Sequence, residues 1–177
     1  MSFNFTCKLP EPTNQKLKYL AIEWLQERGV NLEDIAGLVY EIQKPYIPNL
    51  SIEDCFCSVD RVMDKREVQN SIFTGLSLDE LAEKGLIREP LQTMIKKDDG
   101  LYGIDEILAL SIVNVYGSIG LTNFGYLDKI KLGIIKELNQ HRNRVINTFL
   151  DDIVAAIAAA AAARLAHQTR DQEENLA

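Results

Sequence analysis

Cysteine and histidine are both scarce in this sequence of 177 residues. The three cysteines are Cys7, Cys55 and Cys57, and the two histidines are His141 and His167. An odd number of cysteines without a secretory signal is typical of a protein from the reducing cytosol. The Cys-x-Cys spacing has no histidine near it, which disfavours a zinc site. We therefore expect a cytoplasmic protein with neither a disulfide framework nor structural zinc.

A surplus of positive charge is also missing. The chain has 19 Lys and Arg against 26 Asp and Glu, which gives a formal net charge of -7 and a pI near 4.9. Such a chain has few cations to neutralise phosphates, so we expect no nucleic-acid partner. Residues 31–85 resemble a helix-turn-helix in their succession of short helices, but they include no basic recognition helix.

Neither a signal peptide nor a membrane span is predicted. The first 16 residues contain no apolar core of signal-peptide length. The apolar run after Asp152 ends at Arg164, well short of the roughly 20 residues that a span requires. The uncharged stretch 107–127 is long enough, but Ser, Asn, Thr and three glycines interrupt it. We also find no clear strand pattern and no internal repeat.

The most distinctive segment present is an alanine-rich run at residues 148–167. Between Ala155 and Ala166 the residues other than alanine are Ile157, Arg164 and Leu165. Alanine has the highest intrinsic helix propensity, so this segment is predicted to be a helix. Small apolar side chains on every face allow neighbouring backbones to approach from all sides, which indicates a buried central helix.

Capping signals predict the starts of the other helices. Thr13 begins an amphipathic outer helix at 13–28, and Asn31 with Asp34 begins the next helix. Ser51 with Asp54 begins a long or broken helix that reaches Gly75. Ser77 with Glu80 begins a short helix that ends at Gly85, and Pro90 begins another. We therefore predict an all-α fold, in which about five helices surround the alanine-rich one. The whole chain 1–177 is expected to form one domain, with flexible tails at 1–12 and 168–177.

Five late carboxylates form the candidate site: Asp105, Glu106, Asp128, Asp151 and Asp152. Acids in a first helical turn favour the helix dipole, and Asp151 follows Thr148 at capping-box spacing, so a purely structural role is one interpretation. The alternative is a magnesium site, because oxygen ligands suit a hard cation. The pairs Asp105-Glu106 and Asp151-Asp152 each open a helix that is apolar all round, where unpaired charge is costly. Spacing alone favours the two interpretations equally.

Several cations lie close to these acids in the sequence. Lys129 and Lys131 follow Asp128 and are candidate point charges for a phosphate, although the pattern by itself favours surface solvation. The same holds for Arg142 and Arg144, and His141 has no partner that indicates catalysis. The remaining acidic pairs need no explanation beyond capping and solvation: Glu53-Asp54, Asp79-Glu80 and Asp98-Asp99.

These late motifs resemble the phosphatidylglycerophosphatase A family. The matching pieces are Asp105-Glu106 at the opening of a hydrophobic helix, Phe124-x-x-x-Asp128-x-x-Lys131, and Asp151-Asp152 before the alanine-rich helix. They cover roughly residues 100–166. Over its full length the chain is similar to the soluble Gram-positive branch of that family, including LVYEIQKPYIPNL and LDELAEKGLI. Gly125 and Leu132 stand where the family usually has arginine and proline.

The resemblance implies a Mg²⁺-dependent phosphatase that converts phosphatidylglycerophosphate to phosphatidylglycerol. The five carboxylates would be catalytic, Asp105, Glu106, Asp151 and Asp152 would hold Mg²⁺, and Lys129 and Lys131 would bind phosphate. The partner would be an anionic phospholipid at the membrane surface, met from the cytoplasm at the inner face of the membrane, with helix 13–28 as a docking element.

Two alternatives and one open question accompany this hypothesis. The chain could be a non-catalytic helical interaction module, in which the acids only cap helices, or a phosphatase of a soluble phosphomonoester. Carboxylates at separate points of the structure would contradict a metal site, whereas carboxylates in one polar pocket would remove the main support for the module. Whether the protein forms a homo-oligomer is left open by the sequence.

Overall fold

The computed structural model describes residues 13–140 and 145–176, with side chains as far as Thr169. These residues form α-helices and one 3-10 turn and contain no strand, which confirms the all-α prediction. The elements are α1 (Asn14–Glu27), α2 (Leu32–Gln43), α3 (Ile52–Met63), α4 (Arg66–Glu83), α5 (Leu91–Lys97), α6 (Ile104–Val113), η1 (Asn114–Tyr116), α7 (Gly117–Ile130), α8 (Gly133–Leu138) and α9 (Leu150–Leu176).

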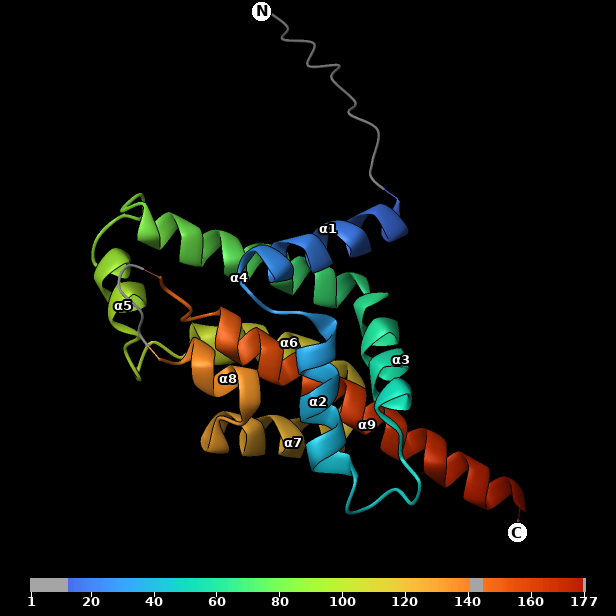
Figure 1. The fold of residues 1–177 in the computed structure, drawn as a ribbon. Helices are drawn as coiled ribbons and strands as arrows, with labels where there is room; N and C mark the ends of the chain where they lie inside the picture. Colours follow the sequence, from blue (N-terminus) through green and yellow to red (C-terminus); the bar gives the residue numbers. More distant parts are fainter. Residues whose placement is uncertain (1–12, 141–144, 177) are drawn as a thin grey trace, which may run out of the picture.

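The alanine-rich helix α9 runs through the middle of the molecule (Figure 1). Every residue from Ile153 to Ala163 is fully buried, and α2, α3, α4, α6, α7 and α8 all pack against this helix. The surrounding helices can approach α9 closely only where the side chains of α9 are small. Alanine is therefore favoured on all faces of this helix. The central helix is confirmed. It starts at Leu150 and continues to Leu176, into the segment predicted to be a tail.

Helix α1 lies on the outside, on top of α4 (Figure 1). Ala21 and Leu25 on its inner face are buried, and the ring of Trp24 meets that of Phe73 edge-on at 5.0 Å between centroids. The helix was predicted to be amphipathic and peripheral, and both features are confirmed. Its apolar face is directed at α4.

Local capping signals placed the first three helix starts correctly. The amide of Lys16 donates to Thr13 Oγ1 at α1. Reciprocal capping boxes open α2, with Asn31 and Asp34, and α3, with Ser51 and Asp54. Both partners of a capping box lie within one helical turn, so such signals need no knowledge of the tertiary structure.

Two expectations about helix boundaries were wrong. Ser77 does not begin a helix, because α4 continues without a break from Arg66 through Gly75 to Glu83. Gly75 instead allows close packing: a Cβ at this position would meet Ile153 Cδ1 and would lie 3.0 Å from Phe149 Cβ. Its missing side chain lets α4 and α9 approach each other.

The uncharged stretch is divided between α6 and α7, and the described residues form eight α-helices besides α9, more than the five or so predicted. Helix α6 ends at Val113, and Gly117, with φ of 69°, marks the turn into α7. By length and composition Ile104–Ile130 qualifies as a membrane span, with a mean hydropathy of 1.5 in a window that is 28% buried. In this fold its two halves pack against α9 and against each other.

Candidate metal centre

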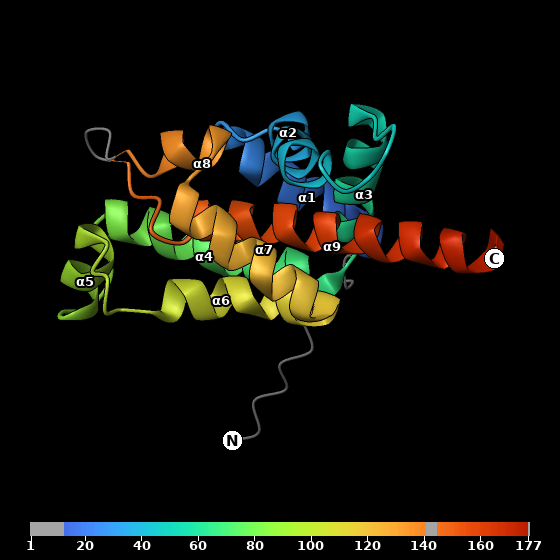
Figure 2. The same ribbon diagram turned by 90° about the horizontal axis from the view of Figure 1, so that it is seen from below.

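Three helix ends meet at one end of the molecule, where α6 and α9 start and α7 finishes (Figure 2). The acids predicted from the sequence all lie on these ends: Asp105 and Glu106 in the first turn of α6, Asp151 and Asp152 in the first turn of α9, and Asp128 in the last turn of α7. Acidic side chains in a first turn interact favourably with the positive end of the helix dipole. The fold therefore brings two such turns together.

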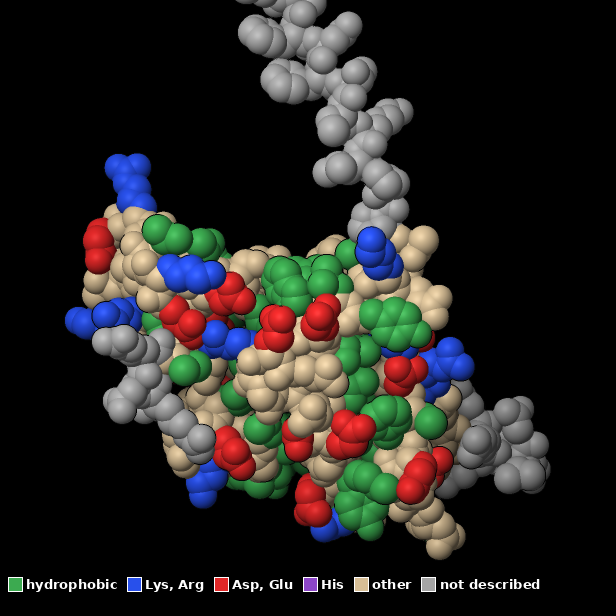
Figure 3. Space-filling model, turned by 45° about the horizontal axis from the view of Figure 1, so that its top comes forward, with side chains coloured by type: hydrophobic (Ala, Val, Ile, Leu, Met, Phe, Trp, Pro, Cys, Tyr) green, Lys and Arg blue, Asp and Glu red, His purple; other side chains and the backbone are tan. Residues whose placement is uncertain are grey.

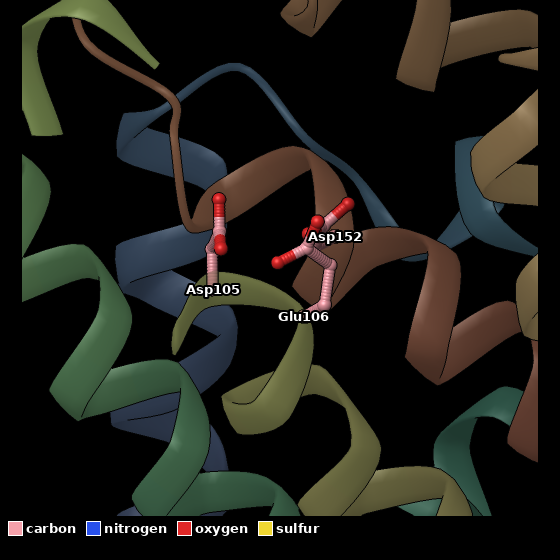
Figure 4. A group of neighbouring side chains, drawn as sticks. All are labelled: Asp105, Glu106 and Asp152. Carbon is pink, nitrogen blue, oxygen red and sulfur yellow. The ribbon is translucent and has the colours of Figure 1, made fainter. Parts of the chain in front are cut away.

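Asp105, Glu106 and Asp152 form a compact carboxylate cluster. Each offers one oxygen atom, and these oxygens lie within 4.8 Å of one another, Asp105 and Glu106 from α6 and Asp152 from the facing turn of α9 (Figure 4). Asp105 Oδ1 and Glu106 Oε2 are buried and have no hydrogen-bond partner among the residues described. Buried acceptors without partners destabilise a fold by about 1–3 kcal/mol each. A set of oxygen-only donors with unmet valences suits a hard divalent cation.

Lys131 links the remaining acids to this cluster. Its Nζ lies 2.6 Å from Asp128 Oδ1, 2.9 Å from Asp151 Oδ2 and 3.5 Å from Asp152 Oδ1. Lys131 itself adopts a left-handed backbone with φ of 51° at the end of α7, which is unusual for a residue other than glycine. This turn follows directly on α7, so the lysine and Asp128 both face the first turn of α9.

The surroundings shift the pKa values of these groups strongly. Burial, with the adjacent Glu106 carboxylate, raises the pKa of Asp105 to about 7. Burial and the neighbouring charge of Asp151 raise the pKa of Asp152 to about 8, although Lys131 acts in the opposite direction. Burial alone would lower the pKa of Lys131, but the carboxylates around it raise the pKa above its usual value. Negative charge is therefore crowded here and only partly compensated by one ammonium group.

Asp79 is a structural acid of this region that the sequence analysis missed. It is fully buried on α4. Its carboxylate accepts hydrogen bonds from the amides of Phe149 (3.2 Å) and Leu150 (3.1 Å), so Asp79 caps α9 from another helix. Thr148 was predicted to do this, but its Oγ1 donates to the carbonyl of Ile95 at 2.7 Å. Asp79 could have been noticed, because it falls on the buried stripe of α4 with Ile72 and Leu76.

The segment leading into α9 is held by a second polar group. Arg28, at the end of α1, donates to Glu83 Oε1 at 2.8 Å and to the carbonyl of Ile146 at 2.6 Å. The amide of Ile146 donates to the same Glu83 oxygen at 2.8 Å. Together with the Asp79 cap, these bonds determine where α9 begins and therefore where Asp151 and Asp152 lie.

The structure thus connects all five predicted carboxylates, three through direct proximity and the others through Lys131. This convergence removes the main argument for the module interpretation, which needed the acids to be separate caps. Lys129 is exposed and makes no ion pair with the described carboxylates, so it is not part of the group. His141, Arg142 and Arg144 lie outside the described residues.

The chain matches known proteins over most of its length. The family model described as phosphatidylglycerophosphatase A matches residues 21–167. The chain is 58% identical to the uncharacterized protein YutG of Bacillus subtilis over 149 residues, covering 84% of this chain and 90% of that protein. It is 57% identical to the uncharacterized protein YpjQ of the same organism over 152 residues, covering 86% of this chain and 85% of that protein.

Solved structures share the fold. A protein of unknown function from Bacillus stearothermophilus matches with a TM-score of 0.84 and 61% identity, over 86% of this chain and 94% of that one. The low temperature requirement C protein of Listeria monocytogenes matches with a TM-score of 0.86 and 56% identity, over 89% and 99%.

Proposed function

The chain belongs to the phosphatidylglycerophosphatase A family, and from this premise we propose that it is a Mg²⁺-dependent phosphatase that hydrolyses phosphatidylglycerophosphate to phosphatidylglycerol. Family membership indicates a phosphatase active in phospholipid metabolism. The choice of lipid and metal is our proposal.

The observation that carries this proposal is the cluster of Asp105, Glu106 and Asp152, with its two buried acceptors that lack partners among the described residues. A chain that only needed helix caps would not retain such acceptors, since uncompensated carboxylates are costly at this depth. A magnesium ion prefers a few carboxylates and keeps positions for water and substrate phosphate. These residues, with Asp151 beside them, would hold the ion.

Each side chain has a task that its position supports. Mg²⁺, when bound, supplies positive charge that shields the phosphate and lowers the pKa of water. Lys131 adds an ammonium group beside Asp128, Asp151 and Asp152, and it is close enough to the cluster to contact a phosphate oxygen there. One of the carboxylates accepts the proton of the attacking water, and Asp128 holds Lys131 in place. Lys129, which is exposed and outside the cluster, would contact the phosphate only before it reaches the metal site.

The proposed reaction takes place where cytoplasm meets membrane. The substrate is an anionic phospholipid, so a protein working from the cytoplasm must bring its cluster to the inner face of the bilayer. The substrate's terminal phosphate is a monoester with two charges near neutral pH, which matches a site built around a divalent cation and a lysine.

Phosphate release tests the proposal directly. Purified protein is incubated with phosphatidylglycerophosphate in detergent micelles, with Mg²⁺, with Ca²⁺, or with a chelator, and a soluble phosphomonoester is tested in parallel. We expect release from the lipid with Mg²⁺ and loss of release with the chelator. Equal turnover of the soluble ester would assign the activity to the second enzyme class, and turnover that ignores the chelator would contradict the metal assignment.

A further inference from the structure

Helices α6 and α7, with η1 between them, expose an unusually apolar surface. No charged residue lies between Glu106 and Asp128, yet large apolar side chains of these elements stay exposed, with Ile107 exposed to 59% and Tyr126 to 51%. We call this the α6–α7 surface, and its exposed large residues are Ile104, Ile107, Val115, Ile119, Leu121, Tyr126 and Ile130. Exposed apolar area of this extent usually marks an interaction site.

The two helices are neighbours on the outside of α9. They contact each other, and Figure 2 shows them next to one another along the side of α9 seen from below. On α6 the exposed residues Ile104, Ile107 and Ser111 follow helical spacing, as do Ile119, Thr122 and Tyr126 on α7. The α6 stripe adjoins α4, where Ser111 and Ser71 share a hydrogen bond of 2.8 Å, and the α7 stripe adjoins the end of α2 at Gln43 and Tyr46. Both stripes hold apolar and small hydroxyl side chains.

Helix α1, which the sequence suggested for docking, offers much less. Its apolar stripe is occupied by α4, and its exposed large apolar side chains are Tyr19 and Leu20. The molecular face that carries α1 mixes acidic, basic and apolar side chains over short distances (Figure 3). A mixed surface of this type is ordinary for a protein in water.

The α6–α7 surface borders the carboxylate cluster. Asp105 and Glu106 open α6, while Asp128 and Lys131 stand at the end of α7. A molecule that covers this surface therefore reaches the cluster at one end of it. An amphiphile with apolar chains and a terminal phosphate matches this layout, with its chains on the apolar surface and its phosphate at the cluster.

Exposed lysines stand at the same end of the surface. Lys129 follows Asp128, and Lys96 and Lys97 follow Ile95, whose carbonyl accepts the hydroxyl of Thr148 just before α9. Lysines beside an apolar face are attracted to anionic lipid headgroups, and here they offset part of the negative charge of the neighbouring carboxylates.

We propose that the α6–α7 surface is the face with which this protein lies on an anionic phospholipid bilayer, its apolar side chains entering the headgroup region and its carboxylate cluster facing the lipid phosphates. The inference rests on the proposed function for the identity of the phosphate substrate. The binding step itself involves no chemistry and can be measured without turnover.

The test is a vesicle sedimentation experiment with two matched double variants. Leu121→Ser with Tyr126→Ser removes one leucine and one tyrosine from the α6–α7 surface, and Leu20→Ser with Tyr19→Ser removes the same pair from α1. Vesicles contain phosphatidylglycerol and phosphatidylcholine, or phosphatidylcholine alone. Ile107→Gln on α6 is an independent variant, used if circular dichroism shows that the α7 pair disturbs folding.

We expect the parent to bind the anionic vesicles and the α7 pair to bind at least about tenfold more weakly, since two apolar side chains no longer leave water. The α1 pair should bind as the parent does. Equal losses in both pairs, a loss in the α1 pair alone, or a parent that does not sediment with vesicles would overturn the inference.

Two further readouts separate this inference from its alternatives. Sedimentation velocity shows whether the parent is a dimer that the α7 pair makes monomeric, and that result would assign the surface to a second copy instead of a membrane. Phosphate release from short-chain monomeric substrate reports on the cluster alone. A protein that binds vesicles but releases no phosphate would contradict the proposed function and leave the docking face intact.

Discussion

Asp79 on α4 and the Asp105-Glu106 pair on α6 both lie near the start of α9, but their carboxylates differ in their hydrogen-bond partners. Both Asp79 oxygens accept backbone amides of α9. Asp105 and Glu106 each keep a buried oxygen without a partner in the described structure. Burial raises the pKa of Asp79 to about 8 and contributes to raising that of Asp105 to about 7. Burial and a shifted pKa therefore do not separate a structural acid from a candidate metal ligand, whereas hydrogen-bond satisfaction does.

A third kind of acid completes the comparison. Asp54 sits at an exposed helix start and forms reciprocal bonds with Ser51, which hold its pKa below the usual value. Such a carboxylate is solvated and locally paired, so its charge costs little. Asp54 is exposed, Asp79 is buried with both oxygens hydrogen-bonded, and Asp105 is buried with one oxygen that lacks a partner among the described residues. The following predictions test this order, from the largest expected effect to the smallest.

Removing one carboxylate from the cluster should have the largest effect. For Asp105→Asn and for Asp152→Asn we expect phosphate release to fall by more than about 100-fold. Mutating residues that only support metal ligands already costs about 10–100-fold in metal affinity or activity. Thermal stabilisation by Mg²⁺ should disappear, as ligand binding to the native state raises stability by mass action. Without metal the variants should melt no lower than the parent, since like charges no longer repel. A parental response to Mg²⁺ in both variants would contradict the metal site.

Removing the acid that caps α9 should affect stability more than chemistry. Asp79→Ala leaves the amides of Phe149 and Leu150 without acceptors, and we expect the free energy of unfolding to fall by about 1–3 kcal/mol. Urea titration at pH 6 measures this change. Asp79→Asn keeps one acceptor oxygen and is expected to lose less. An unchanged midpoint in Asp79→Ala would show that water replaces the cap.

The same acid should make stability depend on pH. Burial raises the pKa of Asp79 from its ordinary value of 3.8 to about 8 in the folded protein, because it outweighs the backbone hydrogen bonds and the charge of Arg28. The folded state thus binds the proton more tightly than the unfolded state. The resulting stabilisation of the fold is fully present below about pH 4 and is lost as pH rises towards 8. Asparagine resembles the neutral form. Urea titrations at several pH values should therefore show Asp79→Asn gaining stability relative to the parent between pH 5 and pH 9, and a constant difference would refute the shift.

The exposed capping acid should matter least. Asp54→Asn removes a first-turn charge at α3, and we expect a loss well below about 1 kcal/mol in the free energy of unfolding. Phosphate release and the response to Mg²⁺ should remain parental. This variant is the matched control for Asp105→Asn, because both exchange one first-turn carboxylate for the same amide. A large loss of activity in Asp54→Asn would mean that the variants act through folding.

Much of the fold could be predicted because its signals are local. The capping pairs at Asn31 and Ser51 and the alanine run of α9 involve residues within a few turns of each other. Predictions were wrong where a distant element intervened. Gly75 was expected to end a helix, but it lets α9 pack against the middle of α4. Ser77 carried a capping signal that the continuing helix overrode.

The candidate site divides in the same way. The sequence by itself determined which residues offer carboxylates, since Asp105-Glu106 and Asp151-Asp152 each precede a long uncharged stretch of a helix, and it placed the alanine helix at the centre. Only the tertiary structure decided that Asp152 joins Asp105 and Glu106, that Asp151 and Asp128 share Lys131, and that Asp79 caps α9 across 70 residues of sequence. The reason is physical: helix formation and capping depend on neighbours in the chain, whereas the partner of a buried charge depends on how the helices pack.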